Sequence, residues 1–449
     1  MMPAMPKQPN ISPFSDYSAY ISKLKHLSVE SHLAVDWNTR VHAALNGQAG
    51  AELRLAAPLE IRRKFGAFFT GTDLGAKLID CGTDYGPKSF FYDPTCGMGD
   101  LLIAAARRLP ICKSLPQTLK QWGKQLSGTD LHHEFIEGAR TRLVLLARQL
   151  HKSDEVSQSP NADFFPNIRV ADGLRQAELF SRATHLLLNP PFGQVAAPAD
   201  CKWAGGRITE AAAFVIAALE QAKPDTKMLA ILPEVLRSGS FSEHWRRRVS
   251  QLAEVQLVQP YGIFDDSADV DVFLLRLNRR TETQNSASRL WTATDAADTE
   301  TVADFFDVHV GRVVPHRDEE SGPLRPYIHP RNIDTWVEVT RISEKRHHGG
   351  LAYKPPFVVL RRTSRPGHPY RAAATVILGT KPVAVENHLI VCEPHDKSAD
   401  TCRALMSQLH TQLVNDFLDQ RIRCRHLTVG AVAAIPFKDR ISTRRTAHD

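Results

Sequence analysis

The sequence predicts an α/β protein built on a doubly wound, mostly parallel sheet, with helices before the sheet and a smaller α+β region after it. From about residue 90, short apolar runs alternate with amphipathic segments of helical length, a pattern typical of parallel strands covered on both faces. Acidic residues follow three successive strand candidates, and beyond residue 290 the alternation stops. The strand candidates are Phe90–Tyr92, Arg169–Ala171, His185–Leu188, Met228–Leu232, Val255–Val258 and Val272–Leu277.

The chain is predicted to have three parts. Residues 14–64 carry apolar positions at mixed three- and four-residue spacing, so residues 1–60 are expected to form a helical cap. Residues 61–280 hold the alternating pattern, and residues 290–449 form a separate α+β domain after a polar linker or loop at 279–288. In that last part we expect strands at 357–360, 375–378 and 388–392, and one helix over roughly 400–419.

Composition excludes several classes of protein. With 449 residues, of which 43% are hydrophobic and 23% charged, the chain can bury a core. It has no run of the roughly 18 apolar residues that a membrane span needs, and no apolar run near its N-terminus that resembles a signal peptide, so a cytoplasmic location is expected. The seven cysteines contain no CxxC pair, which argues against a disulfide framework and a zinc ribbon. We expect reduced thiols and no metal.

Positive charge is concentrated towards one end of the chain. The net charge is +7, but the residues from Arg325 onward contain 20 Lys and Arg against 11 Asp and Glu, whereas the first 324 residues contain 36 against 38. Because phosphate contacts supply much of nucleic-acid affinity, this distribution favours a polyanionic partner at the C-terminal end. A solvated basic face is the alternative interpretation.

The first strand candidate leads into a glycine-containing turn. Asp93 ends the strand, Gly97 and Gly99 follow it, and an amphipathic helix comes next. Glycines at such a turn let the backbone pass close beneath a nucleotide-like ligand. The sixth-position glycine of the dinucleotide fingerprint is missing, which argues against NAD, and the motif alone is also compatible with a tight strand-to-helix turn.

Two further strand candidates end in an acidic residue. Asp130 follows the second strand, where its carboxylate can accept the ribose hydroxyls of an adenosine, and Asp172 follows the third, where it can accept the adenine amino group. Each residue could instead be a helix N-cap or a turn residue. The ordered series of three acids favours a cofactor that contains adenosine.

The strand at 185–188 runs into the motif Asn189-Pro190-Pro191-Phe192. The two prolines remove two backbone donors, so the Pro190 carbonyl and the Asn189 side-chain oxygen are convergent acceptors that fit an NH₂ group. Accepting both hydrogens frees the lone pair of a base amine, so its attack on a sulfonium methyl needs mainly proximity and electrostatics. Phe192 offers a ring on which a base can stack. The alternative is a strand-ending turn with a core phenylalanine.

Three segments together resemble the N6-adenine DNA methyltransferases in which the cofactor motif precedes the catalytic motif. The segments are Phe65–Thr70 (FGAFFT), Asp93–Leu102 (DPTCGMGDLL) and Asn189–Phe192 (NPPF). The resemblance covers about residues 60 to 280 and implies a seven-stranded, Rossmann-like methyltransferase sheet. Gly71 stands where the family often has proline, and Met98 where Ser or Thr is common; both departures concern the local shape of a loop.

The resemblance also implies roles for individual residues. The cofactor would be S-adenosyl-L-methionine, and the reaction would be methylation of adenine N6 in a specific DNA sequence after base flipping, in a restriction-modification or phage-defence context. The implied catalytic residues are Asn189, Pro190 and Phe192. The implied cofactor-binding residues are Phe69, Thr70, Asp93, Cys96, Gly97, Gly99, Asp130, Leu131, Asp172 and Asn189.

A C-terminal target-recognition domain is the family's remaining feature, and the basic region beyond residue 290 fits it. Arginines, a histidine and a tyrosine gather in the loop-like stretch 357–371, a composition suited to contacts with phosphates and base edges. The arginines at 421, 423 and 425 fall on alternate residues, so one strand face could present all three. The candidate DNA-binding residues are Arg361, Arg362, Arg365, Tyr370, Arg371 and Arg423.

Other functions remain open on the sequence. A methyltransferase for rRNA guanine N2 or for a protein glutamine would use the same Asn-Pro-Pro-aromatic chemistry. A DNA-binding methylase subunit that needs a partner for activity is the alternative from another class. The expected partner is double-stranded DNA, and the sequence is also compatible with a separate nuclease, specificity or defence subunit. The roughly 60 residues before FFT are too few for a fused nuclease domain.

Overall fold

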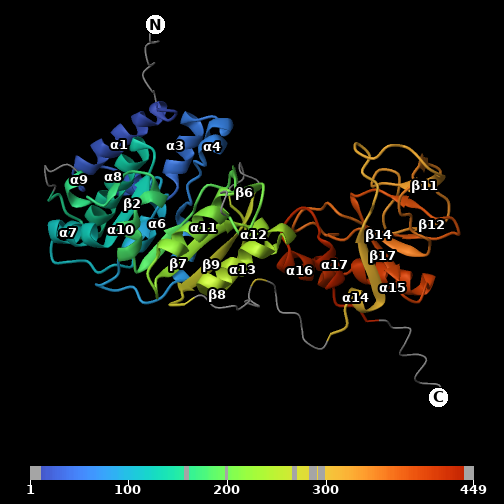
Figure 1. The fold of residues 1–449 in the computed structure, drawn as a ribbon. Coiled ribbons are helices and arrows are strands. Elements are labelled where there is room, and N and C mark those ends of the chain that lie inside the picture. The colour runs from blue at the N-terminus through green and yellow to red at the C-terminus, as the bar shows by residue number, and fades with distance from the viewer. Residues whose placement is uncertain are drawn as a thin grey trace, which may run out of the picture. The chain divides into compact units, whose positions relative to one another are not determined.

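The computed structural model describes residues 12–155, 161–197, 201–264, 270–282, 291 and 299–438. By its internal contacts the chain divides into two compact units (Figure 1). The N-terminal unit comprises residues 1–236 and 243–290, and the C-terminal unit comprises residues 237–242 and 291–449. Most of the polar linker predicted at 279–288 lies outside the described residues.

The N-terminal unit is built on a seven-stranded sheet, which confirms the predicted α/β class. The strand order is β3-β2-β1-β4-β7-β9-β8, and every pair as far as β7 is parallel, whereas β9 runs antiparallel to both of its neighbours. The strands are β1 (Phe91–Asp93), β2 (Leu126–Asp130), β3 (Ile168–Val170), β4 (His185–Leu188), β7 (Lys227–Pro233), β8 (Ala253–Ile263) and β9 (Asp271–Arg279).

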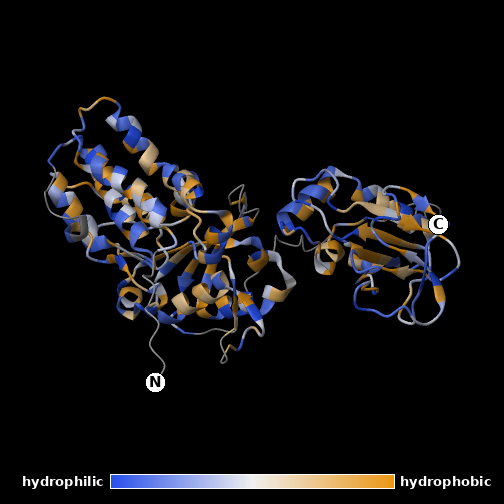
Figure 2. Cartoon of the chain, turned by 90° about the horizontal axis from the view of Figure 1, so that it is seen from above, coloured by the Kyte–Doolittle hydropathy of each residue, from blue (hydrophilic) through white to orange (hydrophobic). Residues whose placement is uncertain are grey.

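Helices cover this sheet, and their apolar sides face its strands (Figure 2). A short hairpin of β5 (Gln194–Ala196) and β6 (Arg207–Thr209) stands between β4 and the next helix. The helices are α5 (Thr72–Asp80), α6 (Asp100–Ala106), α7 (Leu115–Gln125), α8 (His133–His151), α9 (Asn161–Phe164), α10 (Ala177–Arg182), α11 (Glu210–Gln221), α12 (Glu234–Ser238) and α13 (Glu243–Leu252), with the 3-10 turn η2 at Gly173–Arg175.

The region predicted as a cap contains four helices that belong to the same compact unit as the sheet. The helices are α1 (Ser18–Val29), α2 (Trp37–Leu45), α3 (Gln48–Ala56) and α4 (Leu59–Phe65), after the 3-10 turn η1 (Ser15–Tyr17). Of these, α1 and α2 pack on α8, and α3 packs on α2 and on the preceding 3-10 turn; Tyr17, Ile21 and Leu24 are among the buried side chains of this region. Gly138 of α8 allows this close approach, because a Cβ there would lie 2.2 Å from the Met98 sulfur and 3.0 Å from Ile21.

The C-terminal unit has a five-stranded sheet in the order β10-β17-β14-β15-β12 and a three-stranded sheet in the order β13-β11-β16. Their strands are β10 (Phe306–Val310), β11 (Leu324–Ile328), β12 (Glu338–Val339), β13 (Lys345–His347), β14 (Phe357–Arg361), β15 (Ala374–Ile377), β16 (Ala384–Val385) and β17 (Leu389–Pro394). The helices are α14 (Val302–Phe305), α15 (Ala399–Leu409), α16 (Gln412–Arg421) and α17 (Val429–Ala433), and the short 3-10 turn η3 (Ser240–Ser242) also belongs to this unit.

Two predictions in this unit are wrong. The single helix expected over 400–419 is two helices, because the first ends at Leu409 with His410 as its C-cap, and Thr411 caps the second by accepting a hydrogen bond from the Val414 amide. The strand face expected for the arginines at 421, 423 and 425 does not form, since α16 ends at residue 421 and an irregular segment follows.

No helix in the described part of the chain is long and apolar enough to span a membrane. The same described residues contain no group of three or more His, Cys, Asp or Glu side chains placed to hold a metal ion.

Candidate active site

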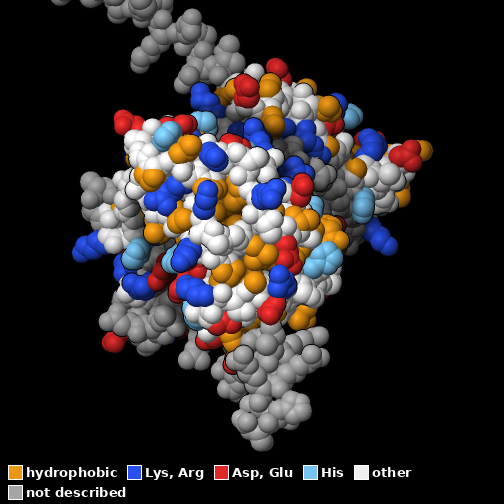
Figure 3. Space-filling model, turned by 90° about the vertical axis from the view of Figure 1, so that its right-hand side faces the viewer, with side chains coloured by type: hydrophobic (Ala, Val, Ile, Leu, Met, Phe, Trp, Pro, Cys, Tyr) orange, Lys and Arg blue, Asp and Glu red, His pale blue; other side chains and the backbone are white. Residues whose placement is uncertain are grey.

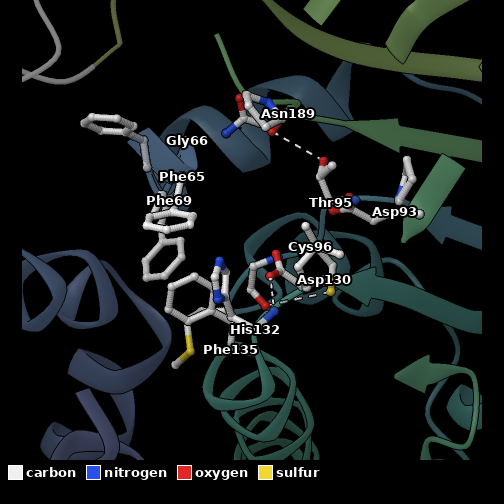
Figure 4. Close-up of a pocket in the computed structure, with 18 of the residues that line it drawn as sticks. Phe65, Gly66, Phe69, Asp93, Thr95, Cys96, Asp130, His132, Phe135 and Asn189 are labelled. Carbon is white, nitrogen blue, oxygen red and sulfur yellow. Dashed lines mark hydrogen bonds between the residues drawn. The ribbon is translucent and has the colours of Figure 1, made fainter. Parts of the chain in front are cut away.

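A cavity of about 320 Å³ lies in the N-terminal unit, at the carboxyl ends of β1, β2 and β4 (Figure 4). Ligands of open parallel sheets bind outside these ends, because the glycine turns and helix starts gather there. The cavity brings together nine of the residues singled out from the sequence: Phe69, Thr70, Asp93, Cys96, Gly97, Asp130, Leu131, Asp172 and Asn189. It is not lined by Gly99, Pro190 or Phe192.

The turn after β1 depends on two glycines with positive φ. Gly97 has φ +49°, and a Cβ there would come within 3.1 Å of the Phe69 ring, which lies against the turn. Gly99 has φ +79°, and its Cβ would approach Ala139 of α8 to 3.0 Å. Gly97 therefore shapes the cavity wall directly, whereas Gly99 lets the turn pack on α8.

Two carboxylates, of which Asp93 is buried and Asp130 half-buried, stand at the ends of β1 and β2. Asp93 Oδ1 accepts a hydrogen bond from the Thr95 amide at 3.0 Å, and burial raises the pKa of Asp93 to about 8. Asp130 accepts from the Gly97 amide at 3.1 Å and from the His132 amide at 2.9 Å, and burial raises its pKa as well. A carboxylate has about four acceptor positions, so both groups can still bind hydroxyl or cationic donors of a ligand.

The third acid is arranged differently. Asp172 is exposed, caps η2 by accepting from the Leu174 amide at 3.1 Å, and forms an ion pair with Arg175 at 3.2 Å. Its carboxylate nevertheless lines the cavity. Asp172 is therefore both the N-cap of η2 and a residue of the cavity lining.

The amide of Asn189 is oriented by a side chain from the FFT segment. Asn189 Nδ2 donates to the Thr70 hydroxyl at 2.9 Å. The Thr95 hydroxyl donates to the Asn189 backbone carbonyl at 3.5 Å (Figure 4). With its NH₂ group engaged in this way, the amide presents Oδ1 as an acceptor. The segments around Thr70 and Asn189 are far apart in sequence, and this contact joins them at one wall of the cavity.

The other two residues of the motif lie outside the cavity lining. Pro190 is buried, and the Phe192 ring packs edge to face on Phe264, with ring centres 5.5 Å apart. The structure therefore places Phe192 at a half-buried position beside another aromatic ring.

A buried arginine holds the cavity walls in place. Arg142 of α8 is fully buried and donates to the carbonyls of Ala44 at 2.8 Å and Met98 at 2.6 Å. It also pairs at 2.8 Å with Asp100, whose other oxygen accepts the Gly71 amide at 2.9 Å. One side chain thus connects the N-terminal helices, the glycine turn and, through Asp100, the FFT segment.

Several cavity residues were not found from the sequence. The most notable is Glu210, at the start of α11, which is half-buried and whose pKa is raised by that burial. Its carboxylate lies close to Gly193, since a Cβ added there would come within 3.1 Å of it. The hairpin β5–β6 brings Glu210 back to the cavity, and no local sequence pattern predicts this position. The others are Lys64, Phe65, Phe68, His132, Phe135 and Phe214, of which only the aromatic-rich FGAFF run gave a hint.

The residues proposed for DNA contact are spread over the C-terminal unit. Arg361 lines a second cavity, Arg362 donates to the Asn387 carbonyl at 3.2 Å, and Tyr370 stacks on His410 with ring centres 4.9 Å apart. Arg365 is exposed and Arg423 is half-buried. Lys, Arg and His side chains are scattered over the face of this unit seen in Figure 3, with acidic side chains between them.

The interpretation of Arg371 as a DNA contact needs correction. Its side chain is 0% exposed, pairs with Asp419 at 3.0 Å, and donates to the carbonyls of Ser364 and Ile422 at 2.7 and 2.8 Å. A guanidinium held in this way inside the fold is structural, because it cannot reach a phosphate without leaving its buried partner.

No protein-family model and no curated protein matches the sequence. Among solved structures, the chain is similar to the type IIL restriction-modification enzyme MmeI in complex with DNA, at 11% identity and TM-score 0.50, over 85% of this chain and 70% of that one. It also matches the type IIG restriction endonuclease BpuSI, at 14% identity and TM-score 0.43, over 89% and 62% of the two chains.

A third match is the type I restriction enzyme EcoKI M protein, at 17% identity and TM-score 0.37, over 60% of this chain and 56% of that one. The matches therefore span less than two thirds of BpuSI and of the EcoKI M protein. At these identities the likeness to MmeI shows a common fold and leaves the chemistry to the site itself.

Proposed function

We propose that this protein transfers a methyl group from S-adenosyl-L-methionine to N6 of adenine in DNA, as part of a restriction-modification or defence system. The observation that carries the proposal is the position of Asn189. Its amide is oriented by Thr70 and lines the same cavity as the carboxylates at the ends of β1 and β2. Solved structures of like fold include a restriction-modification enzyme in complex with DNA, which supports the substrate class.

The residues of the cavity fit the cofactor. Asp93 is a buried carboxylate for which one hydrogen bond, from Thr95, is found in the described structure, so a cationic group of a ligand would favour its ionised form. Asp130 would accept ribose hydroxyls, Phe69 and Leu131 would give apolar contact, and the small residues Gly97 and Cys96 would leave room along the turn. Bound there, the cofactor supplies an electrophilic sulfonium methyl group.

The chain's own groups would act on the target amine. Asn189 Oδ1 and the Pro190 carbonyl would accept its two hydrogens, which makes the nitrogen lone pair available for in-line attack on the methyl carbon. The carbon–sulfur bond would break as the carbon–nitrogen bond forms, S-adenosyl-L-homocysteine would leave, and the methylated amine would then release one proton. The cavity would exclude water and hold the amine near the methyl group, and proximity of this kind accounts for much of the rate of such transfers. The target base must leave the DNA stack to reach the site, and Phe192 would then stack on it.

The decisive experiment expresses the full chain in a bacterial host without DNA methylation and maps modified bases by single-molecule sequencing. We expect N6-methyladenine at one sequence, and its loss by about 10²- to 10³-fold in Asn189→Ala, because a group that stabilises the transition state is removed. The matched control is Asn38→Ala, at an exposed position of α2, which should methylate like the parent.

Other outcomes discriminate between the alternatives. If the purified chain binds the cofactor but wild-type DNA contains no N6-methyladenine, and adding candidate specificity or nuclease subunits does not produce it, the proposal is wrong. Methyl label that appears in ribosomal RNA or in a protein glutamine would instead select those substrates for the same site. Activity only with an added subunit would identify the chain as a methylase subunit that needs its partner.

A further inference from the structure

A second cavity, of about 550 Å³, lies within the C-terminal unit and is distinct from the site around Asn189. It opens where β11, β13 and β14 end and where the loops after β10 and β16 meet. Its volume falls in the range of pockets that hold small ligands or single groups of large ones. We call it the arginine-histidine cavity, after the residues that charge it: His316, His329, Arg331, Arg346, Arg361 and His388.

The acidic groups around this cavity are already engaged. Glu386, the one carboxylate that lines it, accepts from the Tyr327 hydroxyl at 3.3 Å and lies 2.6 Å from His388 Nδ1. Glu344 lies outside the lining and pairs with His329 at 3.1 Å. Three arginines therefore face one carboxylate, and the cavity carries an excess of positive charge.

Arg361 has the fewest hydrogen-bond and ion-pair partners among the half-buried arginines that line this cavity. Its side chain is half-buried at the end of β14, and within the described part of the chain it forms no ion pair. Its Nε is buried without a hydrogen-bond partner, and Nη2 reaches the Ile333 carbonyl only at 3.4 Å. A buried donor without an acceptor is costly, so this guanidinium is suited to an anion that enters the cavity.

The neighbouring arginines differ from Arg361 in their surroundings. Arg346 pairs with Glu320 at 2.8 Å and lies over the Tyr327 ring, so part of its charge is already compensated. Arg331 is exposed, and its side chain makes no ion pair among the described residues. Arg361 and Arg331 thus offer two uncompensated guanidinium groups to the same space.

We propose that the arginine-histidine cavity binds a phosphodiester group of the DNA backbone, with Arg361 and Arg331 as its principal ligands. The planar fork of an arginine matches two oxygens of a phosphate, and a compact anion fits a cavity whose lining carries net positive charge. A backbone phosphate carries no sequence information, so this contact would position the duplex without selecting bases. The assignment of the anion to DNA rests on the proposed function.

The test measures binding of a fluorescent 30-base-pair duplex to the full chain by anisotropy, at several salt concentrations. We expect Arg361→Gln and Arg331→Gln each to weaken binding about tenfold, as for a lost charged hydrogen bond. Each variant should also lower the slope of log affinity against log salt by about one. Arg361→Lys, which keeps the charge without the fork, should fall between. The matched control is Arg341→Gln, an exposed arginine outside the lining, which should bind like the parent.

Unchanged affinity and salt slope in both Arg361→Gln and Arg331→Gln would overturn the inference while DNA methylation by the parent chain still upheld the proposed function. If Arg361→Gln fails to fold by circular dichroism, the exposed Arg331→Gln decides alone. A chain that binds inorganic phosphate or a mononucleotide through Arg361 but shows no such dependence with DNA would also contradict it. Arginine-dependent DNA binding by a chain that transfers no methyl group, either alone or with added candidate subunits, would uphold the cavity inference and refute the proposed methyltransferase function.

Discussion

The two units carry cavities of opposite character. The cavity of the N-terminal unit is lined by five acidic residues, with Lys64 and His132 as its basic or titratable counterparts, and that of the C-terminal unit by three arginines and three histidines with one glutamate. The first suits a ligand with hydroxyl groups and positive charge, and the second suits an anion. The uneven distribution of charge along the sequence is therefore also found in the linings of these two cavities.

The units are alike in another respect, since each contains a fully buried arginine paired with an aspartate. Arg142 pairs with Asp100 in one unit and Arg371 with Asp419 in the other, and both donate to several backbone carbonyls. In sequence the two look different, because Arg142 belongs to an amphipathic helix and Arg371 to a basic loop. An arginine that lines a cavity and an arginine that stabilises the backbone are thus distinguished by how deeply the side chain is buried. Amino-acid composition does not reveal this difference.

The largest expected effect is a loss of folding stability when either of the two buried arginine–aspartate pairs is broken. Arg142→Met should destabilise the N-terminal unit by about 3–5 kcal/mol, because Asp100 is left without its partner. Arg371→Met should destabilise the C-terminal unit to a similar degree and leave cofactor affinity unchanged. Calorimetry of the full chain would measure both, with Arg63→Met, at an exposed position, as the control. A loss below about 0.5 kcal/mol, the usual range of surface substitutions, would show that the buried pairs do not brace their units.

The second prediction tests whether the two cavities act on different ligands. Asp130→Asn should weaken binding of S-adenosyl-L-methionine roughly 100-fold, as for two lost hydrogen bonds to a charged group. Affinity for the DNA duplex should not change. Isothermal titration measures the first quantity and anisotropy the second, with Asp73→Asn, at an exposed position, as the matched control. Equal losses of affinity for S-adenosyl-L-methionine and for DNA would contradict the assignment of the two ligands to different units.

A smaller effect is expected at the contact that orients Asn189. Thr70→Val removes the hydroxyl that accepts from Asn189 Nδ2, so kcat should fall roughly fivefold, as for one neutral hydrogen bond. Cofactor affinity should change less, because the threonine would act through the asparagine. Single-turnover methylation assays would separate the two, with Thr39→Val, at an exposed position, as the control. A change in KM with kcat intact would contradict the orienting role.

The last prediction is a pH dependence of stability. The pKa of Asp93 is about 8 in the fold and 3.8 in its ordinary state, so between these values the native state holds a proton that the unfolded state has lost. Stability therefore falls as pH rises through this window. Asp93→Asn should flatten this decline, which is about 1.4 kcal/mol per pH unit between the two pKa values, so the variant should gain stability relative to the parent from pH 5 to pH 8. Urea unfolding at pH 5 and pH 8 measures this, and parallel curves would show that Asp93 does not titrate there.

Much of the sheet could be predicted from apolar runs. The strand at 185–188 is found residue for residue, because it is short, continuous and buried on both faces. β8 is much longer than the predicted 255–258, since bulges between 255 and 257 and between 260 and 262 interrupt the side-chain alternation that a pattern search detects. The break at Thr411 is hidden for a similar reason, because apolar residues continue on both sides of it.

Phe69 and Thr70 were singled out through the resemblance of their segment, and the other predicted residues of the candidate site lie at or shortly after a strand end. Asp93, Asp130 and Asn189 each end a strand or directly follow one, and parallel strands deliver their ends to one edge. Glu210 comes to the cavity through a hairpin whose course no local pattern describes. Arg371 shows the opposite error. Arginine is a residue type suited to DNA contacts, but this side chain donates to backbone carbonyls within its own unit.

The position of Arg142 has a consequence for the order in which the parts of the N-terminal unit can fold. The glycine turn after β1 receives its hydrogen bond from a guanidinium that also holds the carbonyl of Ala44, so the turn is complete only when the N-terminal helices have docked. Fragments that begin at the FFT segment would contain every recognisable motif but would lack the Ala44 carbonyl that holds Arg142.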